Sequence, residues 1–361
     1  MRLLLPIVIA AILCGCASGP SHQSSRASST ESQSVDQARA SEERGDYAAA
    51  LQIVRPLAEQ NYARAQTLLA EMYLHGHGVS RDTAQALVLY RKAAEQGDGR
   101  AENGLGLMYN SGNGVPEDDA VAAAWYKKAA GHGYAGGMNN LAVMYANGSG
   151  VPLNIANAMV LFYQAADQGY ARAQSNLGAR YSYGDGVPQD CAQGLNWYHK
   201  AADQGFALAQ YDIGVLYDRG QCVGQDDAQA VSWYRKAAEQ GSADAQYNLG
   251  QMYDEGRGLH QDWTLARTWF LKAAEQGHSA AINNLGVMYQ KGQGIQVEPV
   301  IAYAMYAVSA TLDRSTDNSA TANLAKITIN MSPEQTAAGQ TLARNLMQPG
   351  NFRHAFEEAT R

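Results

Sequence analysis

The sequence predicts an all-α protein, a right-handed α-solenoid of stacked helix-turn-helix repeats with an opening helix pair and C-terminal capping helices. Two observations predict this fold: a period of 36 residues, and apolar residues at helical spacing inside each period. A fixed period in this range is typical of solenoids, in which each repeat buries its apolar face by stacking on its neighbours. The columns that carry the period are Tyr73, Tyr109, Tyr145, Tyr181, Tyr217, Tyr253 and Tyr289; Gly76, Gly112, Gly148, Gly184, Gly220, Gly256 and Gly292; and Gly97, Gly133, Gly169, Gly205, Gly241 and Gly277.

The first 15 residues predict a signal peptide. A positive start precedes an apolar run from Leu3 to Leu13, which is too short to span a membrane as a helix and suits a secretory signal. Gly15-Cys16 follows this run and resembles the lipobox of bacterial lipoproteins. The resemblance implies cleavage before Cys16, lipidation of Cys16 and, because Ala17 follows rather than Asp, a place on the outer membrane facing the periplasm. An ordinary cleaved signal is the alternative.

The rest of the chain divides by composition and period. Residues 16–34 predict a flexible linker after the lipidated cysteine, since residues 17–34 hold eight serines and no large apolar side chain. Residues 35–60 predict an opening helix pair without the glycine loop. Residues 311–361 predict capping helices and a tail, with one helix over Ser319 to Thr328 and another begun by a capping box at Ser332. Between them we expect seven repeats over residues 61–310, at 61–97, 98–133, 134–169, 170–205, 206–241, 242–277 and 278–310.

The second copy shows how each repeat becomes a pair of helices. Its first helix carries Ala101, Leu105 and Met108 on one face, at the spacing of an amphipathic helix. Gly106, next to this face, has no side chain and leaves room for Tyr126 of the second helix. The two helices of each copy are therefore expected to pack closely.

Glycine and aspartate mark the helix ends. The first loop glycine of each copy is expected to end the first helix in the left-handed conformation, which other residues adopt at a cost. A carboxylate then begins the second helix, where it can accept hydrogen bonds from free amides, at Asp82, Asp118, Asp190, Asp226 and Asp262. The tyrosine column and the tryptophans share the structural period, so core packing is favoured over a ladder that stacks ligands; the tryptophans are Trp125, Trp197, Trp233 and Trp269.

Together these residues resemble the Sel1-like repeat, a relative of the tetratricopeptide repeat, over residues 61–310. The third copy departs most from the pattern, with Leu161-Phe162 in place of Trp-Tyr and Asn154 in place of Asp. The resemblance implies helical hairpins whose first helices line a concave surface. Some cysteine-rich members of the family are linked to penicillin binding or β-lactamase activity, but this chain has no S-x-x-K motif and that activity is not expected.

Composition and motifs favour a binding protein over an enzyme. The net charge of −7 argues against a nucleic-acid partner, which favours a basic face. No H-E-x-x-H, G-x-S-x-G or phosphate-binding loop appears, and the G-x-G pairs end helices instead of opening them after a strand. His75 and His77 flank a turn glycine and are too few for a strong metal site. We therefore expect no catalytic residues, no metal and no cofactor.

Two cysteines remain after the signal region. Cys191 begins the second helix of the fourth copy, and Cys222 replaces the second loop glycine of the fifth. Stacked neighbours bring these loops side by side, and the periplasm is oxidising. We expect a disulfide between Cys191 and Cys222.

The face of the first helices opposite their packed stripe predicts the binding surface. Arginines occupy it in the early copies and aspartates in the later ones, with Tyr211 and Tyr247 one period apart between them. Aromatic anchors beside charges are typical of binding faces. The candidate partner-binding residues are Arg64, Arg100, Asn103, Asn139, Arg172, Tyr211, Asp218, Asp244, Tyr247 and Asp254. The alternative is that these positions are merely solvated.

These observations favour a non-enzymatic periplasmic scaffold, held to the membrane by its lipid, that binds a protein or peptide in the concave groove. The family resemblance adds a sharper alternative, an immunity protein that neutralises a lipase toxin of type VI secretion. Roles in envelope assembly, polysaccharide export or invasion are equally compatible with the residues. An envelope hydrolase or glycan-binding protein is a further alternative, for which only Asp218, Asp244 and Asp254 are candidates.

Overall fold

The structure, a computed structural model, describes residues 21–313 and 319–360, with side chains from residue 31 onward. Within these ranges the chain forms 19 α-helices and no strand, which confirms the predicted all-α fold, and no helix there is long and apolar enough to cross a membrane. The predicted signal peptide and Cys16 lie outside the described residues. The chain divides into two compact units, unit 1 up to Leu153 and unit 2 from Asn154.

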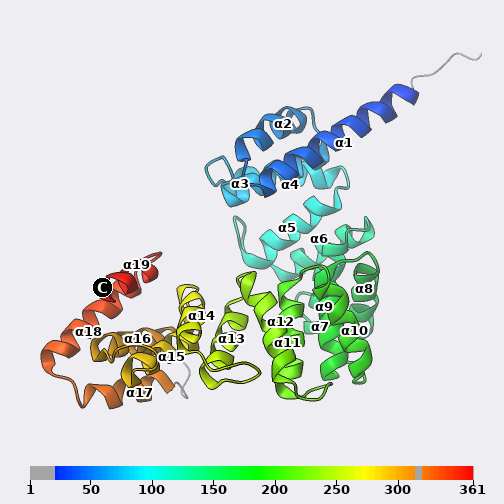
Figure 1. Ribbon diagram of the computed structural model, residues 1–361. Coiled ribbons are helices and arrows are strands. Elements are labelled where there is room, and N and C mark those ends of the chain that lie inside the picture. Colours follow the sequence, from blue (N-terminus) through cyan, green and yellow to red (C-terminus); the bar gives the residue numbers. More distant parts are fainter. Residues whose placement is uncertain (1–20, 314–318, 361) are drawn as a thin grey trace, which may run out of the picture. The chain divides into compact units, whose positions relative to one another are not determined.

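Unit 1 holds the opening helices and the first helix pairs (Figure 1). After α1, each of its helices has 13 residues and is therefore about 20 Å long. Its helices are α1 (Ser21–Glu43), α2 (Tyr47–Glu59), α3 (Ala63–His75), α4 (Thr83–Glu95), α5 (Gly99–Ser111), α6 (Asp119–Gly131) and α7 (Ala135–Asn147).

The first helix, α1, corrects one prediction. Residues 16–34 were expected to form a flexible linker, but α1 is helical from Ser21. Long-range contacts explain the difference: Val35 and Ala38 of α1 are buried, and Asp36 binds Arg64 of α3 at 2.5 Å. These tertiary contacts outweigh the weak helix propensity of a serine-rich segment.

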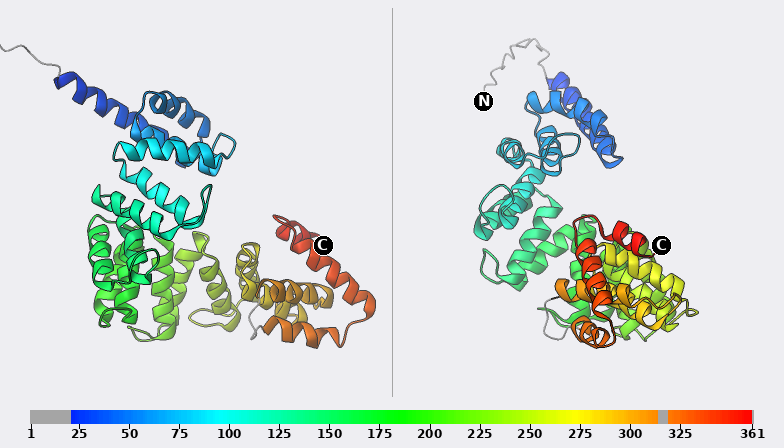
Figure 2. Two further views of the ribbon diagram at one scale, coloured as in Figure 1. Left: turned by 180° about the vertical axis from the view of Figure 1, so that it is seen from behind. Right: turned by 90° about the vertical axis from the view of Figure 1, so that its left-hand side faces the viewer.

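Unit 2 holds the remaining repeat helices and the closing helices. Both views of Figure 2 show its last helices packed together at its C-terminal end. Its helices are α8 (Ile155–Asp167), α9 (Ala171–Tyr183), α10 (Cys191–Ala202), α11 (Ala207–Arg219), α12 (Asp227–Glu239), α13 (Ala243–Glu255), α14 (Trp263–Glu275), α15 (Ser279–Lys291), α16 (Pro299–Leu312), α17 (Ser319–Thr328), α18 (Pro333–Leu346) and α19 (Phe352–Ala359).

The helix ends confirm the predicted capping. Gly112 ends α5 in the left-handed conformation, with a φ of 65°. The carboxylate of Asp118 begins α6 by accepting a hydrogen bond from the amide of Val121 at 3.0 Å, and Asn154 of the divergent third copy caps α8 in the same way. The capping box predicted at Ser332 is present at the start of α18. Capping side chains satisfy amides that have no partner inside the helix.

Close packing within each pair depends on one glycine of the first helix. A Cβ added to Gly106 of α5 would lie 2.4 Å from the ring of Tyr126 of α6, which confirms the predicted role of this glycine. The same contact recurs between Gly214 of α11 and Tyr234 of α12, at 2.7 Å. The aromatic residue that follows the tryptophan position is therefore the deepest side chain of each pair, fully buried at Tyr126, Phe162, Tyr198, Tyr234, Phe270 and Tyr306.

The two columns predicted to be core are structural but mostly half-buried. Only Tyr289 in the tyrosine column and Trp197 in the tryptophan column are buried, at 1% and 8% exposed. The other members are partly exposed, and those that pack against a core cluster are Tyr73, Tyr217, Tyr253, Trp125, Trp233 and Trp269. A lysine three residues later lies over the ring of Trp125, Trp197, Trp233 and Trp269, 3.7–4.0 Å from the ring centroid, a favourable cation–π geometry.

A ladder of glutamine pairs recurs in the repeats, and each rung joins the first helix of a pair to the C-terminal end of its second helix. Each rung runs between residues 30 apart, at Gln66–Gln96, Gln174–Gln204, Gln210–Gln240 and Gln246–Gln276, over 2.6–2.9 Å. In unit 1 one rung is different, because Glu102 and His132 take the two places and contact each other at 2.7 Å. The carboxylate of Glu102 is buried, with 2% of its side chain exposed.

The second loop glycine of each repeat sets the contact between neighbouring pairs. It lies 31 residues after the residue it touches, so a Cβ on Gly258 would stand 2.3 Å from the carbonyl oxygen of Asp227. Cys222 occupies this glycine position with a φ of 65°, and its partner at the same spacing of 31 is Cys191. The disulfide between them, which the sequence predicted, replaces a close backbone contact with a covalent bond.

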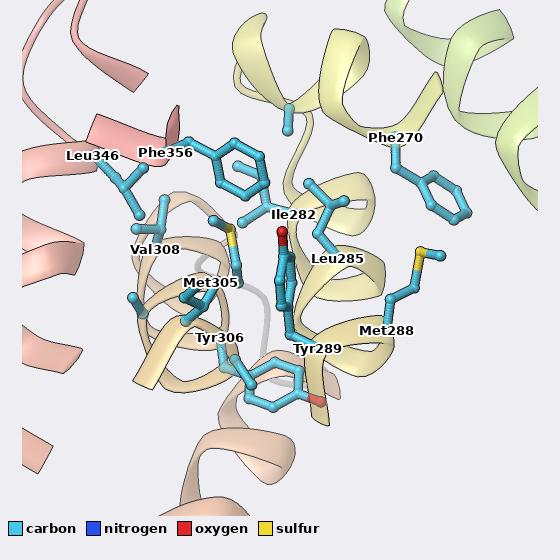
Figure 3. Close-up of a cluster of buried hydrophobic side chains, with 14 of the residues drawn as sticks. Phe270, Ile282, Leu285, Met288, Tyr289, Met305, Tyr306, Val308, Leu346 and Phe356 are labelled. Carbon is cyan, nitrogen blue, oxygen red and sulfur yellow. The ribbon is translucent and has the colours of Figure 1, made fainter. Parts of the chain in front are cut away.

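The last helices close the array at its C-terminal end. Figure 3 shows Tyr289 of α15 between Leu285 and Met305, with Phe356 of α19 beside it. The rings of Tyr289 and Phe356 meet edge to face with centroids 6.0 Å apart. The helix predicted over Ser319 to Thr328 is α17, with the same bounds. Terminal elements of this kind cover an apolar face that would otherwise meet water.

Candidate functional site

In unit 1 the predicted arginines belong to an ion-pair network rather than to a free basic surface. Glu71 of α3 accepts from the predicted Arg100 at 2.7 Å through one carboxylate oxygen, and from Arg39 of α1, which was not predicted, at 3.0 Å through the other. Arg64 is bound by Asp36 of α1 at 2.5 Å. Only 18% of the Glu71 side chain is exposed, so this network is partly shielded from solvent.

Two cavities lie along this network. The larger, of about 510 Å³, is lined by Arg39, Glu71 and Arg100 together with the apolar Leu74 and Leu107. The smaller, of about 320 Å³, shares both arginines and adds Arg64, Asp98 and His132. The first helices α3 and α5 line these cavities together with α1, and the walls are both apolar and charged.

Two predicted site residues of unit 1 are not on the surface. Asn103 of α5 and Asn139 of α7 are 8% and 1% exposed, whereas the sequence prediction needs them open to a partner. Asn140 donates to Asn103 at 2.9 Å and joins α7 to α5. The helices of neighbouring repeats cover this position, so the predicted exposed face is narrower than the sequence pattern suggests.

In unit 2 the predicted residues at the start of the first helices reach the following repeat. Arg172 of α9 lies over the ring of Phe206 at 5.8 Å from its centroid, and Asp244 of α13 lies 3.3 Å from Nε2 of His278. In each pair the second residue is the N-cap of the next first helix, 34 residues later. Arg172 and Asp244 thus combine an exposed position with a role in stacking.

The two predicted tyrosines, Tyr211 of α11 and Tyr247 of α13, each pack one side of the ring against a neighbouring aromatic side chain. The ring of Tyr211 lies 5.9 Å from the buried ring of Tyr234, and the ring of Tyr247 stacks on His278 at 4.6 Å. Both tyrosines remain partly exposed. Rings held in place by their neighbours lose little freedom on binding, which suits them to anchor a partner.

Other residues complete an apolar surface around the two tyrosines. Tyr183 at the end of α9 is 44% exposed and Leu208 of α11 is 49% exposed. Burial raises the pKa of both Tyr183 and Tyr211, and the charges of Asp212 and Arg219 act on both hydroxyls as well. We call Tyr183, Leu208, Tyr211 and Tyr247 the aromatic patch.

Asp212 is the most perturbed acid of this face. Burial raises the pKa of its carboxyl to about 7, against which a hydrogen bond from the hydroxyl of Tyr198 acts. The equivalent positions in the neighbouring copies of unit 2 are amides, Asn176, Asn248 and Asn284. A carboxyl in place of an amide therefore gives this one repeat a charge that depends on pH near neutrality.

The remaining predicted acids are bound in different ways. Asp218 of α11 accepts from the hydroxyl of Tyr234 at 3.0 Å and from Arg257, which also binds Asp227 at 2.7 Å. Asp254, one repeat later, has a buried carboxylate oxygen without a hydrogen-bond partner. Asp218 is thus neutralised by Arg257, and Asp244 lies beside His278. In the part of the chain that the structure describes, no three His, Cys, Asp or Glu side chains could hold a metal ion.

The sequence prediction missed several residues of this surface. Arg39 lies on α1 in a segment adjacent to the predicted linker, and Arg257 lies in a loop. A signal for Arg257 was available, because it stands between two loop glycines, 39 residues after Asp218, and no other copy has an arginine or lysine at that place. Tyr183 and Leu208 could have been found as large apolar residues at polar positions of their columns.

Stacked helical hairpins define a helical repeat protein, an architecture suited to protein–protein interaction. The comparisons with known proteins give the family. The model of the Sel1 repeat matches residues 63–98, 99–134, 135–170, 171–206, 207–242, 243–278 and 279–313. The chain therefore belongs to the Sel1 repeat family.

One solved structure agrees with this assignment, and two others are similar to parts of the chain. The chain is 30% identical to a Sel1 repeat protein from Oxalobacter formigenes, with 68% of this chain and 96% of that chain covered and a TM-score of 0.57. It is 31% identical to a protective antigen of uropathogenic Escherichia coli that displays an SLR fold, with coverage of 91% and 78% and a TM-score of 0.46. An immunity protein from Pseudomonas aeruginosa is 23% identical, with coverage of 59% and 81% and a TM-score of 0.46. No match was found among curated proteins.

Proposed function

We propose that this protein is a non-enzymatic scaffold that binds a protein or peptide on the inner face of its first helices. The aromatic patch of unit 2 is the observation that carries the proposal. Exposed apolar side chains gathered on one face are typical of interaction sites, and tyrosines are frequent anchors there. Scattered exposed leucines would not support the same conclusion.

We propose further that Cys16 carries the lipid and that the protein faces the periplasm from the outer membrane. The disulfide between Cys191 and Cys222 supports this part of the proposal, because disulfides persist in oxidising compartments. A Cys16→Ser variant should lose incorporation of labelled palmitate and leave the membrane fraction. An unlabelled parent protein, or a parent found in the cytoplasm, would contradict the proposed location.

Partner capture tests the binding surface. The lipid-free chain from Ala17 onward is immobilised, and proteins captured from the envelope fraction are identified by mass spectrometry. The double variant Tyr211→Ala/Tyr247→Ala should reduce capture of the specific partner at least about tenfold, since anchor residues carry most of the binding energy. Val160→Ala/Leu265→Ala, which removes exposed apolar side chains from second helices, is the matched control.

The outcome separates the proposed scaffold from its alternatives. Full capture by the tyrosine variant would contradict a role for the aromatic patch. A secreted lipase as the captured protein would make the immunity role the specific function. Turnover of a cell-wall or β-lactam substrate that Asp254→Asn abolishes would instead establish the hydrolase alternative.

A further inference from the structure

The two cavities of unit 1 share a wall that carries guanidinium groups. Arg39 of α1, Arg100 of α5 and Tyr134, the N-cap of α7, line both cavities, so the cavities are adjacent. Arg64 of α3 adds a third guanidinium group to the smaller one. The volumes of about 510 and 320 Å³ lie within the range of ligand pockets, roughly 300–1,000 Å³. We call the two together the arginine cavities.

The protein itself uses these guanidinium groups only in part. Arg100 donates to Glu71 through Nε at 2.7 Å, and Arg39 donates to the same carboxylate through one terminal nitrogen at 3.0 Å. Among the described residues, the two terminal nitrogens of Arg100 have no acceptor, and 43% of this side chain is exposed. Two guanidinium groups thus share one carboxylate, so one positive charge and several N–H donors remain for a ligand.

The acids beside the smaller cavity are already engaged. Asp98 lines this cavity, and its Oδ1 accepts from the amide of Ala101 at 2.8 Å and from the hydroxyl of Thr67 at 3.1 Å. Asp98 begins α5 in this way, and the positive end of the helix dipole offsets its charge. Asp36, which is outside the lining, binds Arg64. The smaller cavity therefore offers hydrogen-bond donors chiefly, which suits a carboxylate.

The larger cavity adds an apolar wall next to these donors. Leu74 of α3 and Leu107 of α5 line it together with the buried ring of Tyr90. The side chain of Leu107 is 48% exposed, so a ligand can pack on it. Glu42 and His77, which also line this cavity, bind each other at 2.6 Å. An exposed leucine beside unused guanidinium donors suits a ligand that is anionic at one point and apolar close by.

We propose that the arginine cavities bind a segment of a partner protein in which an aspartate or glutamate lies one or two positions from a large apolar residue. The carboxylate enters the smaller cavity and accepts from the terminal nitrogens of Arg100, with Arg39 and Arg64 beside it. The apolar side chain packs on Leu107 and Leu74 in the larger cavity. This inference rests on the proposed scaffold function and gives the chemistry of a contact outside the aromatic patch.

A peptide array tests the chemistry of the ligand. Blocked octapeptides of glycine and serine carry every pair of residues at two central positions, either adjacent or separated by one residue, and the full chain in detergent is the labelled probe. We expect the strongest spots to combine Asp or Glu with Leu, Ile, Met or Phe. Spots that favour Lys or Arg, spots that depend on the apolar residue alone, or no signal above the glycine-serine background would overturn the proposal.

Calorimetry with the peptide that carries Glu beside Leu assigns each cavity. We expect a Kd at or below about 1 mM, and at least about fivefold weaker binding when Glu is replaced by Gln or Leu by Ala. Arg100→Gln should remove the difference between the Glu and Gln peptides and keep the difference between the Leu and Ala peptides. Leu107→Ala should do the reverse, because each variant removes the group that one of the two peptide side chains contacts.

Two matched controls change similar side chains outside the cavities. Arg91→Gln alters an exposed arginine of α4 that donates to the hydroxyl of Tyr109, and Val143→Ala alters the exposed residue that follows Leu107 by one period. Both should bind like the parent protein. Unchanged selectivity in Arg100→Gln, or an equal loss of selectivity in Arg91→Gln, would overturn the proposal.

The scaffold function can hold or fail separately. If a partner is captured through the aromatic patch and no acidic-apolar peptide binds, the arginine cavities are not a ligand site and the scaffold stands. If the peptide binds as expected and no partner is captured, the ligand site stands and the proposed scaffold function is wrong.

Discussion

Removal of the disulfide measures two opposing effects at one position. The bond between Cys191 and Cys222 closes a loop of 31 residues, for which chain entropy predicts a stabilisation of about 3.7 kcal/mol. Cys222 also holds a φ of 65°, a conformation that costs a residue with a Cβ about 1 kcal/mol relative to glycine. The variant Cys191→Ala/Cys222→Gly removes the bond and the backbone cost together, so it should lose about 2.7 kcal/mol.

The matched control keeps the backbone cost. Cys191→Ala/Cys222→Ala removes the same bond but leaves a side chain in the left-handed conformation, and it should lose about 1 kcal/mol more than the glycine variant. Urea unfolding followed by circular dichroism, with a local probe such as Trp197 fluorescence, measures both differences. A loss below about 1 kcal/mol for the glycine variant would refute the cross-link reasoning. Equal stability of the two variants would refute the backbone reasoning.

Three further predictions concern single contacts. Gly258→Ala should cost about 2–4 kcal/mol, because its Cβ would stand 2.3 Å from the carbonyl oxygen of Asp227 at a φ of 68°. Gly205→Ala, with open space around it and a φ of 83°, should cost only about 1 kcal/mol in the same thermal melt. His132→Ala should lower the free energy of unfolding by about 2 kcal/mol, because it leaves the carboxylate of Glu102 buried and unpaired. The double variant Glu102→Gln/His132→Gln should recover most of this loss, because it restores a glutamine pair at this rung. Urea titrations that show no recovery would contradict the role of the ladder. Burial raises the pKa of Asp212 from 3.8 to about 7, so between these pH values its carboxyl binds more protons in the folded state than in the unfolded state. The free energy of unfolding should therefore fall by about 1.4 kcal/mol per pH unit as pH rises through this window. Asp212→Asn should remove this pH dependence and match the parent near pH 4, and an unchanged pH dependence would contradict the assignment.

The sequence predicts the repeated part of this fold well because the same local physics recurs in every copy. Position 106 must be glycine because the ring of Tyr126 leaves no room for a Cβ, and position 112 favours glycine because its backbone is left-handed. Asp118 is favoured because its carboxylate accepts from a free amide at the start of α6. Each of these requirements arises within one helix pair. The start of α1 could not be predicted in this way. Its serine-rich residues have no strong local preference, and contacts with Arg64 and its neighbours, about 30 residues later, decide its conformation.

The candidate site was predictable only where a side chain departs visibly from its column. Tyr211 and Tyr247 depart in this way, and the structure places both at a partly exposed, supported position. The burial of Asn103 and Asn139 could not be predicted from the pattern of one helix. These residues are covered by neighbouring repeats, through contacts between residues about 36 positions apart in the sequence. The unpartnered oxygen of Asp254 could be predicted only by comparing repeats, because Phe270 stands where the preceding repeat has Tyr234, whose hydroxyl donates to Asp218.

The closing helices of unit 2 also determine how the molecule can associate. Phe356 covers Tyr289 on the face where an eighth repeat would stack. End-to-end stacking of another copy on this face would require α19 to move away first, so the closing helices oppose head-to-tail growth from this end.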